Sequence, residues 1–213
     1  TRSPGVVMQI SKLRWALAAL ALNVAGAANA ASVSYYLDQS NTEGSWPDNV
    51  NYLQVTIFDS IANPGDIEFL VTPLASLTVS AGTNFGIQAF GFNSTQTLTA
   101  ANIVDPVGWS TGSGNLDGFG AYQVREDTTG TNRKNPLSLR ITGISGDVVA
   151  DYAVAGPGGA QGTYYFAAHV AGMTPVAGQT SAYFGGNAVV PVPAAAWLFG
   201  SAIAGLGWVR RRR

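Results

Sequence analysis

The central part of this chain is predicted to be all-β, an antiparallel β-sandwich of which a jelly roll is one form. Three observations predict this fold class. Eight or nine short apolar or alternating runs follow one another, separated by breaks rich in Gly, Asn, Ser and Thr. No segment among them keeps a 3.6-residue apolar period with helix caps, and the runs do not alternate with helical patterns. Strands in that arrangement pair with their neighbours and stack as two sheets.

The strongest strand signal lies at residues 52–58, where Leu53, Val55 and Ile57 share one face and polar residues share the other. A turn cluster at residues 63–66 leads into a second alternating run at residues 67–72, so the two runs predict a β-hairpin. Other strands are expected at residues 33–37, 85–92, 118–125, 137–142, 148–154, 162–170 and 181–184. Loops are expected at residues 110–117 and 127–135, and at most a turn of helix at residues 72–77 and 98–104.

The composition restricts the partners and the chemistry of this central domain, residues 31–187. The chain has no cysteine, which excludes disulfides and thiol chemistry, and its single histidine makes a zinc site improbable. All 12 acidic residues fall within the domain, against four basic residues, Arg125, Arg133, Lys134 and Arg140, which leaves it with a net charge of −8. Such a surface repels nucleic acid and anionic lipid, so we expect neither as a partner.

The N-terminal residues predict export. Residues 1–7 precede the first methionine and are interpreted as upstream sequence or an alternative start. Residues 8–30 have the pattern of a signal peptide, with Lys12 and Arg14 before an apolar core at residues 15–24. The cleavage site is expected at Ala28 and Ala30, before Ala31, by a signal peptidase acting with the Sec machinery. The alternative, a permanent membrane helix, would need a longer apolar core.

The C-terminal segment, residues 188–213, has three parts in a fixed order. A proline motif comes first, then a charge-free apolar run from residue 194 to 209, then four arginines. At about 1.5 Å per residue the apolar helix spans roughly 24 Å, slightly less than a hydrocarbon core of about 30 Å. The arginines are expected to stay in the cytoplasm. A buried C-terminal helix is the alternative. The proline motif consists of Val190, Pro191, Val192, Pro193 and Ala194. The residues assigned to the membrane helix are Ala195, Trp197, Leu198, Phe199, Gly200, Ile203, Leu206, Trp208 and Val209. The cytoplasmic stop consists of Arg210, Arg211, Arg212 and Arg213.

This tail resembles the PEP-CTERM sorting signal of Gram-negative bacteria, in its VPLPA variant. The short proline motif, the helix opening AAAWLFGS and the terminal arginine run are all present in order. Val192 stands where the variant usually has Leu, and no Glu lies between the prolines. Stretches at residues 35–41, 51–57 and 118–125 are similar to domains that precede such tails. The resemblance implies transient anchoring in the inner membrane with the domain in the periplasm, processing by an exosortase, and a final place at the cell surface or outside the cell, where such proteins accompany exopolysaccharide and biofilm.

One string in the domain matches a catalytic motif. Residues 108–112 have the letters of the G-x-S-x-G nucleophile elbow, and Asp147 or Asp151 and then His169 follow in hydrolase order. The elbow needs a strand before Ser110 and a helix after it, whereas these flanks are typical of loop. We therefore interpret His169 as an ordinary strand histidine and expect no catalytic residues.

Two further kinds of binding residue were considered. A calcium site built from loop acids is an alternative to solvated side chains, although no EF-hand-like or repeat motif supports it; no other cofactor is expected. The acids concerned are Asp38, Glu43, Asp48, Asp59, Asp66 and Glu68. Trp46 and Trp109 lie in predicted loops, where they would either stack on sugar rings or cap the sandwich core.

The sequence thus predicts a non-enzymatic surface or extracellular-matrix protein that is exported and then processed by an exosortase. A carbohydrate-binding module that recognises exopolysaccharide through Trp46 or Trp109 is the alternative, and a secreted serine esterase is a more distant one.

Overall fold

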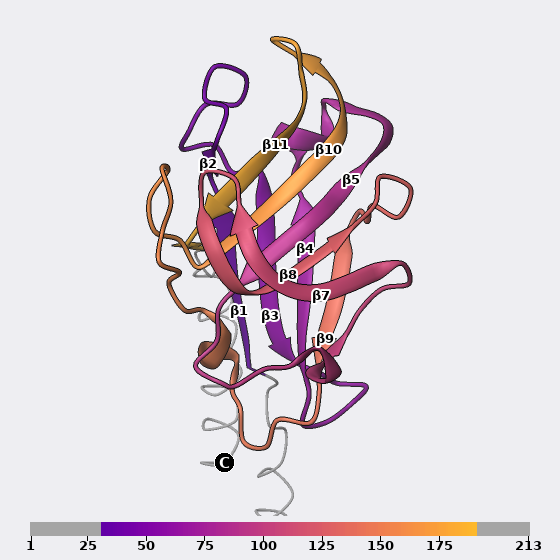
Figure 1. The fold of residues 1–213 in the computed structure, drawn as a ribbon, viewed down its shortest axis with the longest axis vertical. Coiled ribbons are helices and arrows are strands. Elements are labelled where there is room, and N and C mark those ends of the chain that lie inside the picture. The colour runs from indigo at the N-terminus through magenta and orange to yellow at the C-terminus, as the bar shows by residue number, and fades with distance from the viewer. Residues whose placement is uncertain (1–30, 191–213) are drawn as a thin grey trace, which may run out of the picture. The chain divides into compact units, whose positions relative to one another are not determined.

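The computed structural model describes residues 31–190. Both predicted terminal signals, apart from Ala31 at the cleavage site and residues 188–190, lie outside these residues. The described part is an all-β structure of two antiparallel sheets, which Figure 1 shows one behind the other. Among residues 31–190, no helix combines the length and the hydrophobicity that crossing a membrane requires.

One sheet, here called sheet A, has the strand order β12-β1-β3-β4-β9-β6. Its strands are β12 (Ala188–Val189), β1 (Ser32–Leu37), β3 (Leu53–Asp59), β4 (Ile67–Pro73), β9 (Leu137–Ile141) and β6 (Ile103–Val104). The other, sheet B, has the order β2-β11-β10-β5-β8-β7. Its strands are β2 (Gln39–Ser40), β11 (Gln179–Gly186), β10 (Phe166–Val176), β5 (Ala81–Phe92), β8 (Gly120–Thr128) and β7 (Trp109–Leu116). Three short helical turns, α2 (Ala75–Thr78), η1 (Ala100–Asn102) and η2 (Val149–Tyr152), connect them.

The hairpin predicted from alternation is confirmed as β3 and β4. Val55 lies opposite Val71 in an antiparallel register, and the two strands bury every second residue. Gly65 takes a φ of +96° in the connecting turn, a backbone conformation that glycine adopts without steric cost. Alternation predicts the hairpin correctly because one face of each strand packs on the core and the other faces solvent.

Aromatic side chains fill the space between the two sheets. Phe69 of sheet A lies 4.7 Å from Phe92 and 6.1 Å from Phe90 of sheet B, measured between ring centroids. All three side chains are fully buried. Offset and edge-to-face pairs of this kind add to the stabilisation from burial, so one continuous aromatic core joins the sheets without disulfides.

Two expectations about elements are wrong, and one expected strand has different bounds. Residues 110–117, expected to be a loop, lie mostly in β7. Residues 148–154, expected to be a strand, contain the helical turn η2, in which the Asp151 side chain accepts a hydrogen bond from the Val148 N–H at 2.9 Å. The strand expected at residues 162–170 begins at Phe166 and continues to Val176.

A second, smaller cluster covers part of the outer face of sheet B. It consists of Ala89, Leu116, Phe119, Tyr122 and Ala167. Phe119 lies over Gly185 so closely that a Cβ atom there would collide with its ring. The absence of a side chain at Gly185 therefore lets the loop before β8 close down on the sheet.

Candidate functional site

The two tryptophans for which sugar stacking or core capping was open are buried, which contradicts the sugar-stacking alternative. Trp46 is 3% exposed and packs edge-on against Phe184, with ring centroids 6.1 Å apart. Trp109 is 8% exposed, and its Nε1 donates to the backbone oxygen of Asn132 at 2.9 Å. Neither indole presents a free face to a ligand, so both belong to the core, as the alternative interpretation held.

The residues of the hydrolase-like string do not come together. Ser110 lies in β7, and His169 lies in β10, as the strand interpretation expected. The registers place Ser110 opposite Asp127, Asp127 opposite Ala89, and Ala89 opposite His169. Three strand spacings of about 4.8 Å separate the serine from the histidine by about 14 Å, far beyond hydrogen-bond distance.

The two aspartates considered with that string have other partners. Asp147 accepts a hydrogen bond from the Tyr152 hydroxyl. Asp151 accepts hydrogen bonds from the Thr95 and Gln96 side chains. The hydrogen bond from the Val148 backbone N–H, followed by these two, lowers the pKa of the Asp151 carboxyl. Both aspartates therefore form hydrogen bonds that hold the turn around η2 in place.

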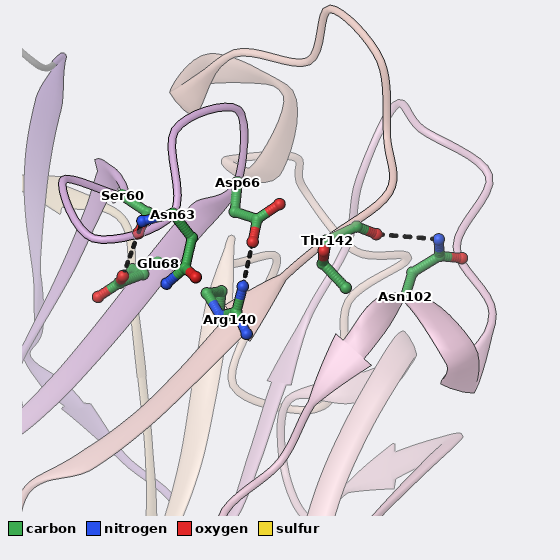
Figure 2. Close-up of polar contacts among 7 residues, drawn as sticks. All are labelled: Ser60, Asn63, Asp66, Glu68, Asn102, Arg140 and Thr142. Carbon is green, nitrogen blue, oxygen red and sulfur yellow. Dashed lines mark hydrogen bonds and ion pairs between the residues drawn. The ribbon is translucent and has the colours of Figure 1, made fainter.

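The loop acids considered for calcium are also held separately. In Figure 2, Asp66 forms an ion pair with Arg140, and Glu68 accepts a hydrogen bond from Ser60. Asp48 and Asp59 accept from backbone N–H groups of Ser40 and Ala31. Within residues 31–190, no three His, Cys, Asp or Glu side chains form a group that could hold a metal ion.

The outer face of sheet B carries a cross-strand row that the sequence did not reveal. His169 and Tyr183 lie opposite each other on β10 and β11, and their rings stack with centroids 4.3 Å apart. On β8, Arg125 and Asp127 form an ion pair, with Nε and Oδ2 3.2 Å apart. Asp127 lies in the same cross-strand row as His169, because both residues are register partners of Ala89 on β5. The row thus combines a flat aromatic pair with charged side chains.

The side chain of Arg133 is fixed beside β5 by two hydrogen bonds. Its Nε donates to Gln88 Oε1 at 2.8 Å, and its Nη1 donates to the Asn84 backbone oxygen at 3.1 Å. The side chain runs over two glycines, because a Cβ at Gly86 would lie 3.2 Å from Arg133 Cβ, and one at Gly172 would lie 2.9 Å from its Nη1. In the described part of the chain, Arg133 makes no ion pair. A fixed, half-buried cation with only neutral acceptors favours an anionic ligand.

His169 is kept neutral by its surroundings. Burial, followed by the charges of Arg133 and Arg125, lowers the pKa of His169 to about 4. The imidazole is therefore neutral at pH 7 and can both donate and accept a hydrogen bond. We define His169, Tyr183, Arg125, Asp127 and Arg133 as the sheet B patch. The grouping of Arg125, Arg133 and Lys134 within ten residues was the one sequence signal that could have indicated it.

A second feature is a cleft of about 270 Å³ at the β6 edge of sheet A. Arg140 and Glu68 lie opposite each other on β9 and β4 and form part of its wall. The full lining is Glu68, Val104, Asp105, Pro106, Ser138, Leu139 and Arg140. Since Arg140 is already paired with Asp66, the cleft offers less free charge than the sheet B patch.

Comparison with known proteins gives no relative: no family model, no curated protein and no solved structure matches the chain.

Proposed function

We propose that this chain is an exported, non-catalytic protein of the bacterial cell surface or extracellular matrix, anchored briefly in the inner membrane and then processed by an exosortase-type enzyme. The observation that carries the proposal is the C-terminal sequence, with its proline motif, apolar run and four arginines in order. A signal-peptide pattern at the other end of the chain supports the same topology. Within the two-sheet fold, a jelly-roll-like arrangement is our finer proposal, because the chain crosses between the sheets repeatedly, as from β4 to β5 and from β8 to β9.

The position of the last strand fits this proposal. β12 pairs with β1, and the Val190 N–H still donates to the Ser34 backbone oxygen at 2.9 Å. Pro191 follows directly, and a proline has no N–H to continue such a ladder. The described hydrogen-bond ladder thus reaches Val190, the first residue of the proline motif, and Pro191 has no N–H to extend it. We propose that a processing enzyme cuts beyond Val190 without unfolding the sandwich.

The proposal is tested by replacing both prolines, Pro191→Ala and Pro193→Ala, in the native host. We expect the unprocessed precursor to accumulate in the inner-membrane fraction, because the enzyme loses the extended segment that it recognises. The matched control is Val192→Leu, which restores the usual VPLPA letters and is expected to be processed like the wild type. Normal release of the double proline variant would contradict the role of the motif.

A second candidate function is binding of an acidic polysaccharide at the sheet B patch. The specific observation that favours it is Arg133, held over the sheet by Gln88 and Asn84. Guanidinium groups bind carboxylate or sulfate with charge-assisted hydrogen bonds, and the neighbouring Tyr183 and His169 rings would supply apolar contact to sugar. The remainder of this acidic domain would repel such a polymer, which confines binding to the patch.

This second function is tested by measuring retention of the protein on a polyuronate and on a neutral glucan. We expect retention by the polyuronate alone, weakened about 10- to 150-fold by Arg133→Gln, since a hydrogen bond to a charged group contributes about 1.5–3 kcal/mol. Arg140→Gln on the opposite sheet is the control and should bind like the wild type. Equal binding by both variants would exclude the patch.

A further inference from the structure

One carboxyl group lies inside the sandwich itself. Glu126 of β8 is 0% exposed, and its register partner on β5 is the core residue Phe90. No donor among residues 31–190 forms a hydrogen bond of normal geometry to either carboxyl oxygen, and its polar neighbours are the Asp105 carboxyl and the Thr111 hydroxyl. Glutamate is almost never fully buried unless it is paired, because transfer of an unpaired charge from water into the protein interior is strongly unfavourable.

A second carboxyl group lies beside it. Asp105 follows β6, and its Oδ2 accepts a hydrogen bond from Thr111 Oγ1 at 2.9 Å. Thr111 is itself the register partner of Glu126 on β7. Asp105 Oδ1 is buried and has no partner in the described part of the chain. Burial, followed by the adjoining Asp105 carboxyl, raises the pKa of Glu126 to about 9. The two acids thus bring three unpartnered carboxyl oxygens and one hydroxyl oxygen to a single place.

A proton on Glu126 would allow one O–H to donate to Asp105 Oδ1, and the Thr111 hydroxyl lies within hydrogen-bond reach of both Glu126 and Asp105. Thr111 has a single hydroxyl proton, however, so these two donors cannot satisfy the three remaining carboxyl oxygens at once. A hard cation differs, because it is coordinated by several oxygens at once and carries the charge that two carboxylates require. Buried polar groups without partners in a native fold commonly indicate a bound water or ion.

We propose that Asp105, Glu126 and Thr111 form a binding site for a hard divalent cation of the calcium class, between β7, β8 and the segment after β6. Calcium suits the site better than magnesium, because it accepts irregular oxygen shells and bidentate carboxylates, whereas magnesium demands octahedral geometry. With two acids and one hydroxyl, backbone and water oxygens would complete the coordination. The site shares no residue with the loop acids considered from the sequence.

The cleft at the edge of sheet A lies beside the proposed site. Asp105 and its neighbours Val104 and Pro106 line that cleft, whose volume of about 270 Å³ exceeds that of a hydrated cation. Asp105 therefore borders the cleft and also lies next to the buried Glu126, so the cleft brings solvent to the Asp105 side of the proposed site. This site would work as a stabilising element whether or not the exported-protein proposal is correct.

The test is a thermal melt of the full chain in a non-ionic detergent, after EDTA treatment, with 10 mM calcium chloride, 10 mM magnesium chloride or neither. For a site with a Kd of about 10⁻⁴–10⁻³ M, as in extracellular calcium modules, calcium should raise Tm by about 3–10 °C. Glu126→Gln should abolish that shift, because it removes one carboxylate while keeping the side-chain shape. The control Glu43→Gln changes an exposed glutamate and should keep the shift.

The result that overturns the proposal is a Tm that does not respond to calcium in the wild type, or a response that Glu126→Gln retains. If a proton occupies the site instead, the metal-free wild type will lose stability as the pH rises from about 4.5 to about 9, and calcium will not restore it. If Glu126→Gln does not fold, Asp105→Asn provides the same comparison from the other side of the site.

Discussion

His169 lies face to face with Tyr183, with ring centroids 4.3 Å apart and ring planes inclined by 11°. The two residues are opposite each other on β10 and β11. The stack covers one face of the imidazole, while Arg133 and Arg125 oppose its protonation. The sole histidine of the chain is therefore held neutral at pH 7 by burial and by the two nearby arginines.

The first prediction is that His169 titrates with a pKa of about 4, below the usual value of 6.5. Because the folded-state pKa is lowered, the stability contributed by the neutral imidazole is complete above pH 6.5 and is lost as the pH falls toward 4. An NMR titration measures this directly, since only one histidine gives signals. Arg133→Gln should raise the midpoint; an unchanged midpoint in that variant would contradict the proximity of the two charges.

The second prediction concerns the aromatic core. Phe90→Ala should lower the free energy of unfolding by about 3–5 kcal/mol, because Phe90 is fully buried against Phe69, Phe92 and Phe166. Urea denaturation followed by tryptophan fluorescence measures the change. Val107→Ala, at a residue that is 91% exposed, should change it by less than about 0.5 kcal/mol. Similar values for the two variants would mean that the sheets do not pack as described.

The third prediction concerns the closeness of Phe119 to sheet B. Gly185→Ala should destabilise the domain by about 1–3 kcal/mol, because the new methyl group collides with the Phe119 ring. Gly44→Ala is the matched control, since nothing lies within 4 Å of a Cβ at that position. The melting temperatures of the two variants measure this difference. A Gly185→Ala variant that melts at the same temperature as the wild type would show that the loop before β8 does not cover the sheet.

The fourth prediction is that Ser110 has no enhanced nucleophilicity. A fluorophosphonate probe should label neither the wild type nor Ser110→Ala, because the register places His169 three strands away. The Ser110 Oγ instead lies 3.4 Å from the Asp127 backbone oxygen. Labelling of the wild type that disappears in Ser110→Ala would restore the esterase hypothesis.

The fold class could be predicted because local alternation is strong wherever one strand face is buried. β4 alternates buried and partly exposed residues along its whole length. β7 escaped prediction because its burial is concentrated at Trp109 and Leu116, and the residues between them are Gly, Ser, Thr and Asn. The apolar residues around η2 predict a strand, because the hydrogen bond from the Val148 N–H to the Asp151 side chain leaves no local apolar pattern.

The candidate sites could not be predicted, since they depend on strand order. Arg133 reaches Gln88 across 45 residues of sequence, and Asp105 reaches Glu126 only because β7 and β8 pair. Trp46 was interpreted as a loop aromatic because its neighbours Ser45 and Pro47 are turn formers, although its indole packs on Phe184 from the far end of the chain. Such contacts between distant segments leave no local periodicity to detect.

The most direct test of the proposed function is the intact mass of the mature protein isolated from the surface or medium of the producing organism. We expect an N-terminus at Ala31, a C-terminus close to Pro191-Val192-Pro193, and no Arg210–Arg213. A released form that still carries all four arginines would mean that the tail is a plain anchor or not a sorting signal, and would contradict the proposal.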